Sequence, residues 1–180
     1  MEVYSLHPDA NHWAGLYPVE EDDWYRFEPF DGTPMAAGWE PVEVLWDNAD
    51  GRQGWGDFFT VNGAPVVTGR AVEALGDLLE GRGELLPLTV LGGGEAYAFN
   101  ITRLSDALDR DRSAYVYYDA DRIMKVDDYV FDPDKVEAET IFKLPIRPKT
   151  FEYVTDGFRH RVEQAGLTGF RLKAPVWTGG

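Results

Sequence analysis

Residues 141–172 hold the local signals that most constrain the fold. Thr155 is placed to cap a helix, because its side-chain oxygen can accept a free amide hydrogen of the first turn. Gly166 supplies the left-handed residue that commonly ends a helix. Between them, apolar residues recur at helical spacing at Phe158, Val162 and Ala165. The stretch therefore predicts an amphipathic helix between two strands. The second strand is indicated by the alternation of Phe170 and Leu172 with Arg171 and Lys173.

A second capped helix is predicted nearer the middle of the chain. Thr68 is its cap, Gly81 lies just past its end, and its apolar stripe consists of Ala71, Leu75, Leu78 and Leu79. Pro87 lacks an amide donor, which places the strand Leu85–Leu91 at the edge of a sheet. Further strands are expected at Pro41–Asp47, Glu95–Ile101, Ala114–Tyr118 and Ile123–Phe131, and a short helical segment at Leu104–Leu108.

These elements favour an α+β fold, with a mostly antiparallel sheet and two or three short helices packed on one side. We expect residues 1–180 to form a single domain, since the length fits one core and no linker interrupts the pattern. Residues 1–54 form an acidic, aromatic-rich segment, and residues 7–39 are expected to contain loops and short strands. Five of the six Trp residues lie before Phe58, and burial in a core is the expected role for them.

Cysteine is absent from the chain, which excludes disulfides, thiolate metal sites and a cysteine nucleophile. The first residues, MEVYSLHPDANHW, lack the basic start and apolar core of a signal peptide. No apolar run approaches the roughly 20 residues that a membrane span needs. We therefore expect a cytoplasmic protein that does not enter the membrane.

The net charge of −15 argues against direct binding to nucleic acid or to an anionic membrane, because both carry the same sign. Residues 1–60 hold 13 Asp and Glu but only two Arg. The sign reverses within residues 141–173, where the basic residues are Lys143, Arg147, Lys149, Arg159, Arg161, Arg171 and Lys173. A cationic partner and an electrically polarised molecule are therefore expected.

Three short motifs resemble ligand sites, and each has a structural interpretation that we favour. Gly92–Gly94 leads into another strand, which indicates a hairpin turn instead of a phosphate loop. Asp47–Gly51 has the wrong acid spacing for a calcium loop and is predicted to be a turn. His7 and His12 flank Asp9, but Pro8 argues against a helix that would bring the two rings together. No metal site or cofactor is predicted.

Catalytic residues are not predicted either. His160 lies between Arg159 and Arg161 in the predicted helix, which indicates an exposed side chain and not a general base. The acidic pairs Asp22-Asp23 and Asp127-Asp128 are expected to be solvated surface, although some pair of acids in the fold could still have glycosidase spacing.

Five runs of residues carry a family resemblance through their order along the chain. They are WGDFF (Trp55–Phe59), APVVTGRAVEALGDLL (Ala64–Leu79), ITRLSDALDRDRS (Ile101–Ser113), DPDKVEAETIFKLP (Asp132–Pro145) and EQAGLTGFRL (Glu163–Leu172). Together they resemble an immunity-protein family of bacterial polymorphic toxin systems. The resemblance covers residues 55–172 and makes residues 55–180 a family-like body.

The resemblance implies a non-enzymatic protein that binds a cognate toxin and blocks its active site or its access to substrate. An acidic inhibitor is suited to a basic toxin, such as a nuclease with a positive nucleic-acid groove. Two alternatives remain open at this stage. One is a hydrolase that uses a carboxylate pair, and the other is a non-catalytic structural or regulatory module.

The expected partner-binding residues are Glu20, Glu21, Asp22, Asp23 and Trp24. They lie outside the resemblance, and a surface that fits one particular toxin can differ between relatives. The run also joins consecutive acids, which attract a basic partner, to an aromatic residue of the type enriched at binding hot spots. The alternative is a flexible acidic loop that serves only solubility.

Overall fold

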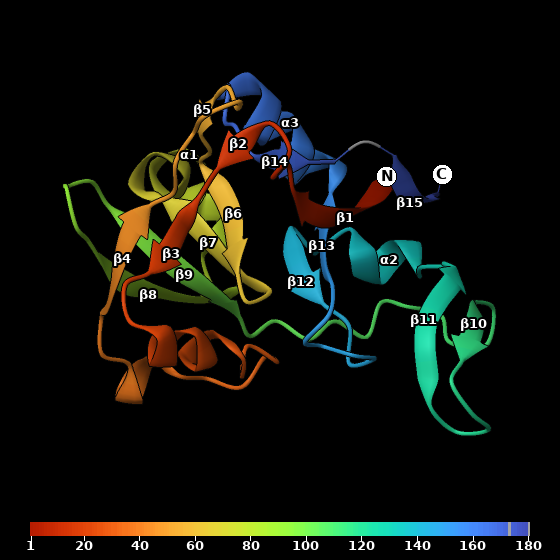
Figure 1. Cartoon of the computed structure of the whole chain (residues 1–180). Coiled ribbons are helices and arrows are strands. Elements are labelled where there is room, and N and C mark those ends of the chain that lie inside the picture. Colours follow the sequence, from red (N-terminus) through yellow and green to blue (C-terminus); the bar gives the residue numbers. More distant parts are fainter. Residues whose placement is uncertain (173, 180) are drawn as a thin grey trace.

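The structure, a computed structural model, describes residues 1–172 and 174–179. Most of its strands lie in two sheets, and helices α1 (Gly69–Leu79) and α3 (Asp156–Gln164) pack between them (Figure 1). Most strand pairs are antiparallel. The predicted α+β class is thus confirmed, with the strands divided between two sheets.

The larger sheet has six strands in the order β3 (Leu16–Pro18), β4 (Val42–Trp46), β8 (Gly83–Val90), β9 (Ala96–Ile101), β7 (Ala64–Thr68) and β6 (Phe58–Val61). Its one face supplies Val67, Phe99 and Ile101 to the core that contains α1 and α3. Its other face packs against the N-terminal segment through Val44, Val66 and Leu86, among others.

The second sheet is built around β1 (Glu2–Pro8), and its order is β12 (Ile141–Lys143), β13 (Glu152–Thr155), β1 and β14 (Phe170–Arg171). β15 (Pro175–Thr178) also pairs with β1. Two short pairs complete the strands: β2 (Trp13–Ala14) with β5 (Gly54–Trp55), and the hairpin β10 (Ala114–Tyr117) with β11 (Ile123–Asp128). The hairpin projects from the body at the lower right of Figure 1.

Three further helices are short. They are the 3-10 helices η1 (Glu21–Phe27) and η2 (Ala36–Gly38), and α2 (Pro133–Val136). Loops and short strands were expected in residues 7–39. The strands β2 and β3 match this expectation, whereas the helix η1 does not. The predicted helical segment Leu104–Leu108 is wrong, because it is extended and bridges to Lys143 and Phe131 instead. Lys173, which the strand pattern included, lies outside the described residues.

The two predicted helix caps have different outcomes. Thr68 accepts a hydrogen bond from the Ala71 amide at 3.3 Å, as expected of a cap. Thr155 occupies the N-cap position of α3, but its hydroxyl donates to the main-chain carbonyl of Glu139 at 3.2 Å and makes no capping bond. The capping role of Thr155 was therefore wrong, since β13 turns this side chain into the protein toward the residues that precede β12.

The edge position predicted from Pro87 is also wrong, because β8 lies between β4 and β9. Pairing with β4 begins only at Leu88, one residue later. The carbonyl of Pro87 accepts a hydrogen bond from the Trp39 indole nitrogen at 2.9 Å. The amide and carbonyl of one strand residue face the same side, so the absent hydrogen of Pro87 faces Trp39 and interrupts no strand pairing.

Candidate functional site

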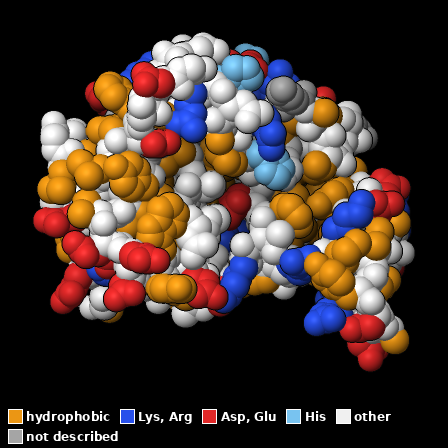
Figure 2. Space-filling model, in the orientation of Figure 1, with side chains coloured by type: hydrophobic (Ala, Val, Ile, Leu, Met, Phe, Trp, Pro, Cys, Tyr) orange, Lys and Arg blue, Asp and Glu red, His pale blue; other side chains and the backbone are white. Residues whose placement is uncertain are grey.

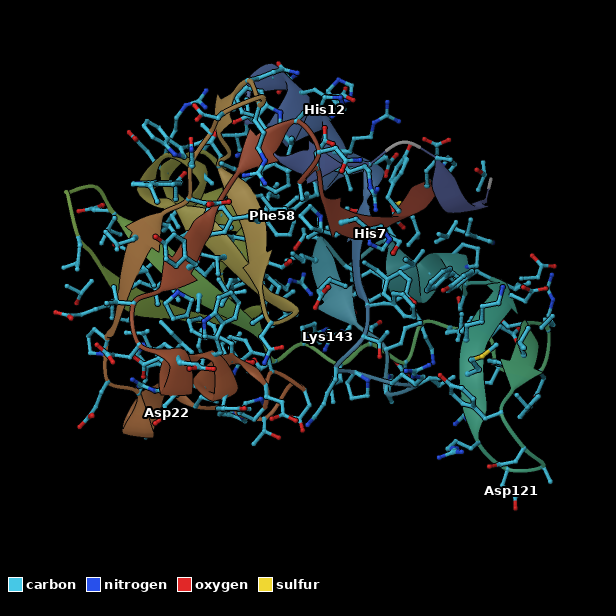
Figure 3. All side chains as sticks on the ribbon, in the orientation of Figure 1. His7, His12, Asp22, Phe58, Asp121 and Lys143 are labelled. Atoms are coloured by element: carbon cyan, nitrogen blue, oxygen red, sulfur yellow. The ribbon has the colours of Figure 1, made fainter. Side chains whose placement is uncertain are left out.

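The expected partner-binding residues lie together at the start of η1. We call Glu20, Glu21, Asp22, Asp23 and Trp24 the acidic element. Glu20, Glu21 and Asp22 are exposed, and Asp22 points away from the body at the lower left of Figure 3. Asp23 is half-buried and pairs with Arg26, with 3.5 Å between the two charged groups. Three carboxylates in succession are therefore presented to solvent.

Trp24 is 38% exposed and lines a shallow groove of about 190 Å³. Trp13 and Tyr17 line the same groove, together with Phe59 and the ion pair of Asp47 with Arg52 at 2.8 Å. Hydrophobic side chains gather over β3 and β4 in Figure 2, and acidic ones lie below them. The structure thus places an aromatic surface beside the carboxylates.

Sequence reasoning singled out only Trp24 for this surface and assigned the N-terminal tryptophans to a core. Trp39 and Trp46 are partly buried and pack against a core, as expected, whereas Trp13 and Trp24 line the groove and Trp55 is 56% exposed. Their concentration in an otherwise polar stretch was the available signal for Trp13. Nothing comparable marked Tyr17, because its place in the groove depends on β3.

Aromatic side chains pack together in and just after the last turn of η1, the helix that contains most of the acidic element. Phe27 and Phe30 are buried and stacked at 6.0 Å between ring centroids, and both pack edge-on against Trp39. Trp24 and Phe27 are spaced by three residues within η1, which matches the period of a 3-10 helix, and Phe30 follows the end of that helix. The Arg26 guanidinium also lies 5.0 Å from the Trp39 ring centroid. The acidic run is accordingly part of a packed helical turn and not a free loop.

The buried carboxylates of the chain are committed to structural contacts elsewhere. Asp57 accepts hydrogen bonds from Thr68, Arg70 and Thr168. Glu139 pairs with two arginines, Arg82 at 2.5 Å and Arg103 at 2.6 Å. Burial raises the pKa of Glu152, but this carboxyl faces Lys143 in the core. Each of these three carboxylates is therefore paired with a basic side chain.

A cleft of about 710 Å³ lies away from the acidic element, between the first turns of α1 and the Gly92–Gly94 turn. It contains Asp57, whose oxygens are already bonded, and the exposed Glu73 and Glu95.

The histidines are separate from one another. His7 lies 2.9 Å from the Ser5 hydroxyl, and burial, followed by the charge of Arg171, lowers its pKa. His12 pairs with Asp9 at 2.8 Å, and His160 is exposed, as predicted. Within residues 1–172 and 174–179, no group of three or more His, Asp or Glu residues is arranged to hold a metal ion. The predicted turns at Asp47–Gly51 and Gly92–Gly94 are confirmed.

Comparison with known proteins adds a family match. No curated protein matches this chain. Across the described part of the chain, no helix combines the length and the apolar character that crossing a membrane requires. A family model that matches residues 90–175 confirms the resemblance found in the sequence and favours a non-enzymatic inhibitor. The acidic element lies outside the matched residues. Over residues 90–175 the chain matches the model of the Imm11 immunity protein family.

Proposed function

We propose that this protein is an immunity protein that neutralises a cognate bacterial toxin by covering a basic active-site or substrate-binding surface. The match of residues 90–175 to an immunity protein family carries this proposal. Such a protein acts by binding, so it needs neither a catalytic site nor a cofactor. The acidic element and its aromatic groove are the toxin-binding surface in this proposal.

The charge distribution supports a basic partner. Thirteen acids against two Arg in residues 1–60 give the N-terminal part a negative field, and Glu20, Glu21 and Asp22 project it into solvent. Such fields accelerate the encounter of oppositely charged proteins. Trp24, Trp13 and Tyr17 add apolar area that can be buried on contact and so slow dissociation. A nuclease is a toxin class that fits, because its substrate groove is positive.

Co-expression with the protein encoded beside this gene tests the proposal. Rescue of cells from a toxic neighbour, together with a stoichiometric complex, is the expected result. Turnover of a substrate without a partner would instead support the carboxylate hydrolase. A neighbour that is neither toxic nor bound would contradict the immunity role and leave the structural or regulatory module.

A further inference from the structure

The segment that follows the acidic element, and shares Trp24 with it, is held to the body through its main chain. We call residues 24–36 the N-terminal strap. The body side chains Asn62, Lys143 and Asn100 donate to strap carbonyls, at Trp24 (3.1 Å), Phe30 (2.5 Å) and Thr33 (2.8 Å) respectively. The Glu84 carboxylate accepts from the strap amides of Met35 at 2.7 Å and Ala36 at 3.2 Å. Four body side chains therefore hold five main-chain atoms of the strap.

Two of these four body side chains carry charge, Lys143 and Glu84, and Lys143 is the more deeply buried. It is 1% exposed, and its ammonium also donates to the Pro148 carbonyl at 2.8 Å and lies 3.3 Å from Glu152. Burial raises the pKa of Glu152, and the Lys143 charge opposes that rise. Figure 3 shows Lys143 between the lobe that bears Asp22 and the hairpin that bears Asp121. One buried cation thus connects the strap, β13 and the loop after β12.

A buried ion pair is weak evidence for stability, because two apolar side chains of similar size often stabilise a core as well. What an apolar pair cannot do is bind a carbonyl of another segment. The contact with Phe30 spans 113 positions of sequence and joins the strap to the family-matched residues. This makes positioning the better explanation for a lysine at this site.

We propose that Lys143 is a positioning residue for the toxin-binding surface, docking the strap through the Phe30 carbonyl so that the acidic element is preorganised on the body. The inference rests on the proposed function only for the identity of the partner, a toxin, that the positioned surface binds. Because the hold is on main-chain atoms, the exposed side chains of the strap can change without loss of docking. The body then holds the strap in place, and the strap positions the acidic element, whose side chains set the choice of toxin.

The test compares two variants that differ only in the ammonium. E152Q keeps Lys143 and its contact with Phe30, whereas K143M/E152Q removes the donor without leaving a buried carboxylate unpaired. K135M is the control, since Lys135 is an exposed lysine paired with Asp106 at 2.7 Å. Hydrogen exchange followed by mass spectrometry reports each segment of the free protein. Amides of residues 24–36 should exchange about tenfold faster in K143M/E152Q than in E152Q, with β7, β8 and β9 unchanged.

Unchanged exchange in the strap, or faster exchange spread equally over β7 to β9, would overturn the inference. The same variants are then measured with the toxin encoded beside this gene. Only the docked form binds, so apparent affinity falls by the factor by which the docked fraction of the strap falls, and the strap exchange rates of each variant give that fraction. An affinity ratio between K143M/E152Q and E152Q that differs from the ratio of their docked fractions would also contradict the inference. Failure of every variant and of the parent to bind would refute the proposed function, while the exchange result would still decide whether Lys143 positions the strap.

Discussion

Replacing Trp24 with Ala should weaken the toxin complex mainly by speeding its dissociation. Trp24 is 38% exposed in the free protein, so about 95 Å² of an indole surface of about 250 Å² remains available to a partner. At about 25 cal/mol per Å², full burial of that area contributes about 2.4 kcal/mol. That loss corresponds to an increase of about 60-fold in the dissociation rate if association is unaffected.

Surface plasmon resonance with immobilised toxin measures both rates directly. Tyr117→Ala is the matched control, because Tyr117 is a comparably exposed aromatic, at 50%, on the projecting hairpin. Its dissociation rate should equal that of the parent. An unchanged rate for Trp24→Ala, or an equal increase for both variants, would refute the placement of the groove in the interface. Thermal melting of the free variants checks that Trp24→Ala remains folded.

Three further predictions concern charge, stability and pH. Serine at all four positions Glu20–Asp23 should slow association and flatten its dependence on salt, because long-range attraction is lost; stopped-flow rates at several salt concentrations check this. Thr155→Val should cost about 1–3 kcal/mol by leaving the Glu139 carbonyl without its donor, and a chemical unfolding curve matching the parent would contradict this. Burial alone would raise the pKa of Glu84, but the bonds from Met35, Asn100 and Ala36 lower it below its ordinary 4.5. The ionised Glu84 carboxylate therefore stabilises the docked strap above pH 4.5, and this stabilisation is lost as pH falls through the lowered pKa. Protection of the strap amides, measured relative to the exchange of unstructured amides at the same pH, should fall over that range in the parent. It should not change over that range in Glu84→Gln.

The sequence predicted correctly those features that depend on neighbouring residues and that tertiary contacts do not change. Thr68 precedes an apolar stripe and caps α1 as expected, because its hydroxyl donates to Asp57 while its oxygen still accepts from the Ala71 amide. Thr155 stands in the same local pattern, yet β13 directs its hydroxyl to Glu139. The difference comes from tertiary contacts, which a capping pattern does not encode.

Other features depended on residues far apart in the chain. Pro87 occupies an interior strand only because Trp39 takes the place of a strand neighbour beside it. Lys143 was counted with the basic residues of residues 141–173, and its burial follows from acceptors at Phe30 and Pro148 that no periodicity reveals. The acidic element was visible as a charge run, whereas its groove required β3 and η1 to meet.

The most direct test of the immunity role is a titration of the purified toxin's activity with this protein. The account predicts that activity falls in proportion to added protein and is abolished at an equimolar ratio, with the complex recovered intact. Undiminished toxin activity at a large excess of this protein would contradict the account, as would inactivation of the toxin by far less than an equimolar amount.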